Sequence, residues 1–219
     1  MASYVYIANA ALDRIGQGQI LSLDDTTTSA RKCKLHIYEC IRQVLRLGKW
    51  KAATKQATPA QLSDVPLFQW AYAYQLPNDY IRMVKVIAAE IPSADAAAQG
   101  STGPAFWDGY EVPDYAIQGK TLLANDTVVQ MNYVADLTMG DNDIDVTDAT
   151  LTELFSLNLA VVLCWPFQQD RSQREALFAE YQMKLRKALA ADAQDSKDPL
   201  VNRLDDSEWI RERRFSTNA

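Results

Sequence analysis

The segment 11-ALDRIGQGQILSLDDTTTSARKCKLHIYECIRQVLRLGKW-50 decides how the N-terminal part of this chain folds. Apolar residues recur in it at three- and four-residue spacing on both sides of a short joint, which is typical of two amphipathic helices. The first helix is expected to run from about Ser3 to Ile15 and to end at Gly16. The second is expected to run from a cap among residues 27–29 to about Leu47 and to stop at Gly48. The segment carries no catalytic constellation, which favours a structural building block over an enzyme.

The pattern becomes strand-like from Thr58 to about Met139, with Pro, Gly, Asn and Asp between short apolar runs. Strands are expected at residues 70–76, 81–89, 115–118, 121–124 and 127–137. The first two are expected to pair as neighbours through a tight connection at Pro77–Asp79, and Gly119 with Lys120 is expected to turn a short hairpin.

Helical periodicity returns at about Asp148, which is placed to cap a helix that Pro166 is expected to end. A last helix is expected over about residues 172–193, with Glu180 and Lys184 four residues apart as an ion pair. The candidate core of these helices and of the N-terminal pair consists of Leu12, Ile15, Ile37, Ile41, Leu45, Trp50, Leu154, Phe155, Leu159 and Leu185.

The order helices, strands, helices favours an α+β fold. We expect a helical bundle formed from both ends of the chain (residues 1–57 and 147–195), an inserted antiparallel β domain (58–146) and an extended C-terminal arm (196–219). The arm is polar but has spaced apolar anchors, which indicates that it orders on a neighbouring protein. Its candidate contact residues are Leu200, Leu204, Trp209, Ile210, Arg211, Arg213, Arg214 and Phe215. The polar loop from Ser93 to Ala105 is expected to be exposed, and its role stays open.

Composition limits the classes of function. The chain has 219 residues, 22 basic and 28 acidic side chains and a net charge of −6. This negative net charge disfavours a nucleic-acid-binding protein, because phosphate contacts need clustered Lys and Arg. We expect no leader segment, and the apolar runs are shorter than the roughly 20 residues of a membrane span. The odd set Cys33, Cys40 and Cys164 in apolar helical settings indicates reduced core thiols after synthesis in a cytoplasm.

Motifs for bound ligands are incomplete in this sequence. Gly119–Thr121 resembles the end of a phosphate-binding loop, but Asp114 stands where that motif requires glycine. Asp141, Asp143 and Asp145 resemble the start of a calcium loop, but the glycine and the bidentate glutamate of that loop are missing. We therefore expect no cofactor and no metal.

Four blocks of residues together carry a resemblance to a known family. In chain order they are Leu12, Ile15, Gly16, Ser22, Leu23, Ala30, Arg31, Tyr38, Arg42, Leu45 and Trp50; Tyr74 to Tyr80 with Arg82 and Val86; Leu154, Ala160, Pro166, Tyr181 and Leu185; and Trp209 with Arg211. With this layout the chain resembles the head-to-tail adaptor family of short-tailed bacteriophages, often called tail tubular protein A. The match spans nearly the whole chain.

The resemblance implies a structural virion protein and not an enzyme. Subunits of that family form a ring, typically of twelve copies, between the portal protein and the tail nozzle protein. Double-stranded DNA passes through the lumen of the ring without sequence-specific binding, and no membrane is involved. The bundle builds the ring wall, the arm binds the portal and the β domain faces the nozzle, so the expected location is the head-to-tail interface of the virion.

Two other classes of function stay open as alternatives. A tail-associated cell-wall hydrolase could use a carboxylate pair, because the acidic residues offer many pairs and nothing selects one. A triad built on His36, the single histidine, is disfavoured because no evident nucleophile accompanies it. A helix-turn-helix reader of DNA is disfavoured by the long second helix and the acidic composition.

Overall fold

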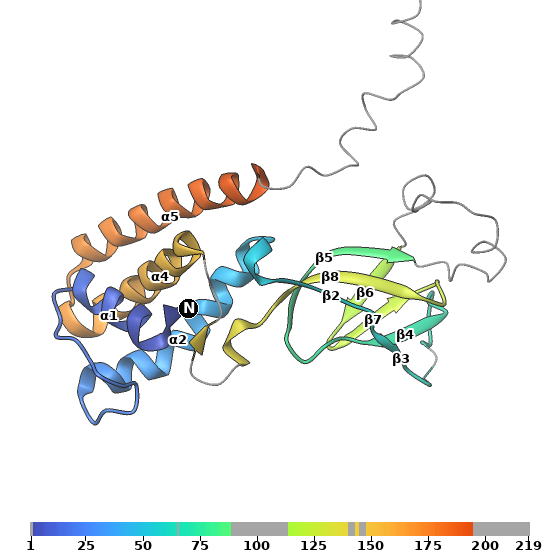
Figure 1. Ribbon diagram of the computed structural model, residues 1–219, viewed down its shortest axis with the longest axis horizontal. Coiled ribbons are helices and arrows are strands. Elements are labelled where there is room, and N and C mark those ends of the chain that lie inside the picture. Colours follow the sequence, from blue (N-terminus) through green and yellow to red (C-terminus); the bar gives the residue numbers. More distant parts are fainter. Residues whose placement is uncertain (1, 65, 89–113, 140–142, 145–147, 195–219) are drawn as a thin grey trace, which may run out of the picture.

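The computed structural model describes residues 2–64, 66–88, 114–139, 143–144 and 148–194 of the chain. The predicted α+β class is confirmed, since four α-helices and two antiparallel sheets occur among these residues. The helices gather at one end of the molecule and the sheets at the other (Figure 1). The candidate arm residues between Leu200 and Phe215 and the loop from Ser93 to Ala105 lie outside the described residues.

Helix α1 (Tyr4–Arg14) starts and ends where the sequence predicts. The hydroxyl of Ser3 accepts a hydrogen bond from a backbone N–H of the first turn (3.1 Å), which satisfies one donor that the helix leaves free. At the other end Gly16 has φ +64°, and the N–H of Gln17 donates to the carbonyl of Leu12 (2.9 Å). Glycine adopts this left-handed closure without strain.

Helix α2 (Thr28–Leu47) is capped by Thr27, whose hydroxyl accepts a hydrogen bond from an N–H of the first turn (3.2 Å). The helix stops at Gly48, as predicted. A side chain has no room at this position, because an added Cβ would lie 2.4 Å from the ring of Trp50. The Trp50 ring is buried and its indole N–H donates to the carbonyl of Val44 (2.8 Å), so the ring closes the end of the helix.

Helix α4 (Ala149–Gln168) is capped by Asp148, as predicted, but Pro166 does not end it. That prediction is wrong because a proline in the last turn removes only one hydrogen bond, and the helix continues until Gln169 takes φ 54°. Within the described part of the chain α4 is the one helix long and apolar enough to cross a membrane, but 61% of that window is buried inside the protein. A buried core helix passes the same test.

Helix α5 (Arg171–Gln194) covers the last predicted helix. α4 is the central helix, since it packs against α1, α2 and α5, whereas α5 packs chiefly on α4. Most candidate core residues are buried in the cluster that these helices share: Leu12, Ile15, Ile37, Ile41, Leu45, Trp50, Leu154, Phe155 and Leu159. Leu185 is only half-buried at the edge of this cluster, because α5 has one main neighbour to cover it.

The strands form two antiparallel sheets. One has the order β2 (Thr54–Ala57), β8 (Val129–Ala135), β5 (Tyr80–Ala88), and the other has the order β3 (Ala60–Gln61), β4 (Tyr72–Gln75), β7 (Thr121–Ala124), β6 (Tyr115–Gln118). Side chains from both sheets meet in a second hydrophobic cluster, which includes Tyr74, Val86, Leu122 and Met131. The sheets therefore cover each other's apolar faces.

The connection at Pro77–Asp79 differs from the prediction. The strands on either side of it were expected to pair, but β4 lies in one sheet and β5 in the other. A three-residue connection serves either arrangement, and both strands feed the same apolar cluster, so the sequence pattern does not separate the two cases. The hairpin of β6 and β7 is confirmed, with Gly119 at φ +61° in its turn.

The strand region starts at Thr54, before the predicted start at Thr58, because β2 pairs with β8. The chain passes from α2 to the sheets through a 3-10 turn, η1 (Lys51–Ala53), and leaves β8 through a second one, η2 (Leu137–Met139). A short ladder joins β1 (Ala2–Ser3) to β9 (Asp143–Ile144).

Candidate functional site

A group of charged side chains joins α2 to the sheets. We call this group the seam; it consists of Arg42, Arg46, Asp79, Arg82 and Asp136. Arg42 Nε on α2 donates to Asp136 Oδ2, directly after β8, at 2.7 Å. Asp136 Oδ1 also accepts from the N–H (2.9 Å) and the hydroxyl (2.6 Å) of Thr138. Only 6% of the Asp136 side chain is exposed, so a nearly buried carboxylate is neutralised from the helix.

Arg46 and Arg82 cross between α2 and β5. Arg46 Nη1 donates to the carbonyl of Ile81 on β5 (3.3 Å). Arg82 Nη1 donates back to the carbonyls of Arg46 (3.2 Å) and Leu47 (3.0 Å) at the end of α2. Carbonyls in the last turn lack helical partners and carry partial negative charge, so a guanidinium group is favoured there. The two arginines hold β5 to the end of α2 through backbone carbonyls.

Asp79 completes the seam at the start of β5. Its carboxylate accepts from Lys55 Nζ (2.8 Å) and from the hydroxyl of Tyr133 (2.9 Å), and its carbonyl accepts from the N–H of Asp136 (2.6 Å). Burial alone would raise the pKa of Asp79, but the bonds from Lys55 and Tyr133 together outweigh burial and lower it. Burial, reinforced by the Asp79 charge, raises the pKa of Tyr133 to about 12. At neutral pH the carboxylate is therefore ionised and the phenol is neutral.

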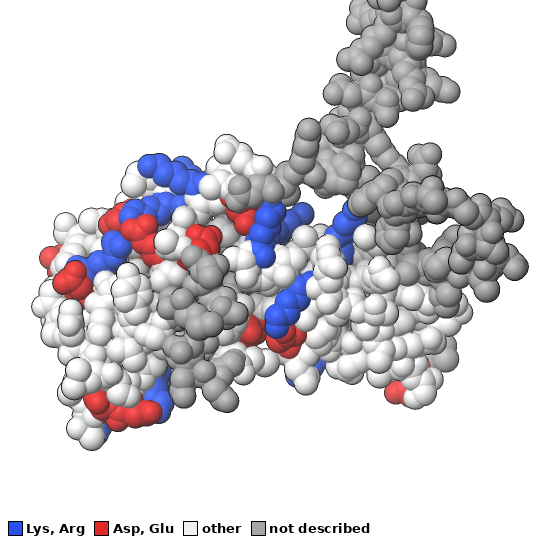
Figure 2. Space-filling view, viewed as in Figure 1, with Lys and Arg blue, Asp and Glu red and all other residues white. Residues whose placement is uncertain are grey.

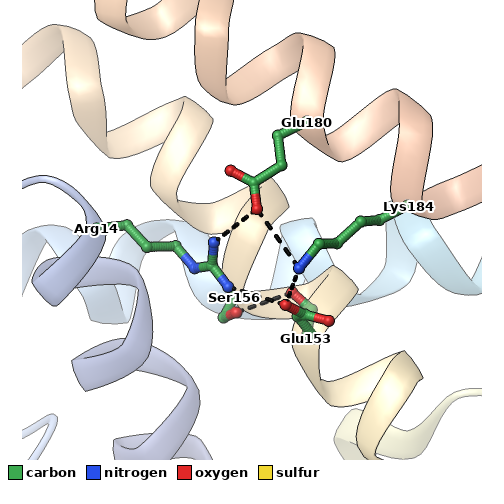
Figure 3. A network of polar contacts seen from close by, with 5 residues as sticks. All are labelled: Arg14, Glu153, Ser156, Glu180 and Lys184. Carbon is green, nitrogen blue, oxygen red and sulfur yellow. Dashed lines mark hydrogen bonds and ion pairs between the residues drawn. The ribbon is translucent and has the colours of Figure 1, made fainter.

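A second polar group, the three-helix network, joins α1, α4 and α5 (Figure 3). Arg14 on α1 donates to Glu153 on α4 and to Glu180 on α5, each at 3.2 Å. Lys184 Nζ lies 3.4 Å from the Glu180 carboxylate and also contacts that of Glu153. The predicted ion pair between Glu180 and Lys184 is confirmed, and it forms part of this larger set of alternating charges.

The hydrolase alternative needs a pair of carboxylates, and the three-helix network brings two carboxylates together. A glycosidase needs one carboxyl group with a raised pKa to donate a proton. Here the hydrogen bond from Lys184, helped by Arg14, lowers the pKa of Glu153. Both carboxylates share cations from neighbouring helices, which suits a role in packing α5 onto α4.

Exposed apolar side chains mark a loop that the sequence analysis missed. Leu67 and Phe68 lie between β3 and β4 with 91% and 80% of their surface exposed. Gln69 has φ 58°, an unfavourable conformation for a residue with a side chain, and Trp70 N–H turns back to the carbonyl of Phe68 (2.6 Å). An apolar pair directly after Pro66 in a turn-rich stretch is the sequence signal for this loop.

On the face shown in Figure 2, charged residues gather over the helices and the seam, and the sheets carry few.

The cysteines and the incomplete ligand motifs of the sequence lie at structural positions. Cys33, Cys40 and Cys164 are buried free thiols, as expected. Burial raises the pKa of Cys33 to about 11 and that of Cys40 to about 12. The stretch Gly119–Thr121 is the β6–β7 turn and the first residue of β7. His36 is half-buried on α2. No group of three or more potential metal ligands occurs among the described residues, and Asp141 and Asp145 lie outside them.

Basic side chains line the outer face of α2. Arg31, Lys34, Arg42 and Arg46 are exposed, whereas Lys32 is half-buried. The ammonium of Lys32 lies 4.3 Å from the Phe167 ring centroid and donates to the carbonyl of Pro166 (2.8 Å). The sequence analysis did not predict the bond from Arg42 to Asp136. The turn at Asp136 does have a local signal, because an Asp directly after an alternating strand with Thr two residues on is typical of an Asx turn.

Comparison with known proteins adds no family to these observations. No protein-family model matches the chain, and no curated protein matches its sequence.

Proposed function

We propose that this chain is a head-to-tail adaptor subunit of a short-tailed bacteriophage, a structural virion protein and not an enzyme. In this proposal the helices form a bundle domain from both ends of the chain, the sheets form an inserted β domain, and residues 196–219 form an extended arm. About twelve copies assemble as a ring between the portal protein and the nozzle protein, and DNA passes through the lumen.

The observation that carries the proposal is the position of the residues that give the family resemblance. Arg42, Asp79 and Arg82 belong to that set: Arg42 and Arg82 bond between α2 and the sheet region, and Asp79 bonds beside them to Lys55 on β2. Gly16 and Trp50 belong to it as well, and they close the ends of α1 and α2. The residues that carry the resemblance therefore hold structural elements of the subunit in place. A ring wall needs subunits whose elements are held in this way.

Two regions are the proposed contacts with partners. In the arm, Trp209, Ile210 and Phe215 would fill a groove on the portal, and the arginines beside them would pair with acidic portal groups. On the β domain, the exposed pair Leu67 and Phe68 would contact the nozzle, since exposed apolar side chains commonly mark protein contacts.

Electron microscopy of the protein mixed with portal rings tests the proposal. We expect added density of matching symmetry on one face of the portal. Deletion of residues 197–219 should abolish docking and leave thermal unfolding unchanged, because the described residues supply both apolar clusters without this segment. Absence of density with the full chain would contradict the adaptor role, and normal occupancy by the truncated chain would contradict the role of the arm.

The same preparation separates the adaptor from the hydrolase. A ring-former should leave a peptidoglycan suspension turbid. Clearing that a single substitution such as Glu153→Gln eliminates would favour the hydrolase instead.

A further inference from the structure

The two crossing arginines of the seam, Arg46 and Arg82, leave most of their hydrogen-bonding capacity unused. A guanidinium group has five N–H donors. In the described part of the chain each arginine donates through Nη1 alone, to carbonyls of β5 or of the end of α2. Within the described residues neither forms an ion pair with a carboxylate, whereas Arg42 beside them does.

The backbone contacts hold these two guanidinium groups in place. Each is fixed by a carbonyl of the opposite element, so their remaining donors are directed before any ligand arrives. Both guanidinium groups therefore lie where β5 meets the end of α2.

We propose that Arg46 and Arg82 form a binding site for a carboxylate side chain of a second copy of this chain. Fixed guanidinium groups suit a carboxylate because planar forks make paired, charge-assisted hydrogen bonds. This inference rests on the proposed ring and assigns one contact between its neighbouring subunits.

The charge balance of the chain favours a second copy over nucleic acid as the occupant. The net charge is −6, so a phosphate backbone would be repelled by most of the surface. The chain itself offers exposed carboxylates that form no ion pair within the described part, at Asp13, Asp64 and Asp114. Exposed carboxylates on one subunit could therefore pair with Arg46 and Arg82 on the next, which have no carboxylate partner among the described residues of their own chain.

The test is self-association of the full chain, measured by sedimentation velocity at up to about 0.5 mM protein. We expect wild-type association to weaken by about tenfold or more between low and high salt, because charged contacts are screened. The variant R46Q/R82Q keeps an amide donor near each carbonyl but loses both charges, and it should associate at least about tenfold more weakly. The matched control K120Q/K187Q removes two charges elsewhere and should associate like wild type.

Each other outcome overturns the site. A wild type that stays monomeric at the highest concentration, or R46Q/R82Q that associates like wild type, would contradict it. If R46Q/R82Q lacks a cooperative thermal transition, it is not folded and the salt dependence of wild-type association becomes the test. Wild-type association that does not change with salt would then contradict the site. Binding of a DNA duplex of about 20 base pairs by wild type but not by R46Q/R82Q would assign the arginines to nucleic acid. Normal portal occupancy by R46Q/R82Q would overturn this contact and leave the adaptor role standing.

Discussion

Asp136, with only 6% of its side chain exposed, accepts a hydrogen bond from Arg42 on α2 at 2.7 Å. The pair joins two parts of the chain that have separate apolar clusters. Its strength therefore bears on whether the helical part and the sheets move as one body.

Removing the arginine should destabilise the protein. Arg42→Ala leaves the Asp136 carboxylate with its Thr138 bonds alone, and leaving such a buried group partly unpaired costs about 1–3 kcal/mol. The measurement is the urea midpoint near neutral pH. Lys34→Ala is the matched control, because the Lys34–Asp24 pair is mostly exposed and its loss should change the midpoint little. Adding Asp136→Asn to Arg42→Ala should restore part of the loss, and strictly additive effects of the two substitutions would show that the pair is not coupled.

Gly48 is a position where a single added methyl group should destabilise the protein. Gly48→Ala places Cβ 2.4 Å from the Trp50 ring, and overpacking of this kind costs about 1–3 kcal/mol. Gly18→Ala is the control, since nothing lies within 4 Å of its added Cβ, and a change within about 0.5 kcal/mol is expected. Thermal unfolding of the two variants checks this. Equal stability of both would mean that Trp50 moves aside without loss.

Local signals in the sequence predicted the helix ends correctly at Gly48 and Asp148 and placed the cap of α2 among three residues that include Thr27, because caps depend on a few neighbouring residues. The sheet partners of β4 and β5 were not predictable, since one short connection fits a hairpin and a crossing between sheets equally well. The Arg42–Asp136 bond spans 94 positions, and no local pattern pairs one arginine with one aspartate over that distance. The contacts of the seam therefore depend on how the strands are arranged and could not be predicted from the sequence.

The three cysteines should resist thiol reagents in the folded protein. Burial raises the pKa of Cys33 to about 11 and of Cys40 to about 12, and burial also raises that of Cys164. Since the thiolate is the reactive form, fewer than about one in a thousand of the Cys33 and Cys40 thiols is ionised near pH 8. An aromatic disulfide reagent should label no thiol quickly in the native state and all 3 in denaturant. Ser172→Cys, at an exposed position, should add one fast thiol, and fast native labelling without it would contradict the burial.

Acid should weaken the attachment of α5 through the three-helix network. The hydrogen bond from Lys184 lowers the pKa of Glu153 below its ordinary value of 4.5, so its contribution is present above that pH and is lost as pH falls through the lowered value. The side chain is 38% exposed, so solvent screening keeps the contribution modest. Glu153→Gln should be less stable than wild type near pH 7, and its urea midpoint should fall less between about pH 6 and pH 3. Glu175→Gln, in the exposed pair with Arg171 on the same helix, should keep the wild-type pH dependence. A Glu153→Gln profile parallel to that of wild type would show that the network does not couple α5 to pH.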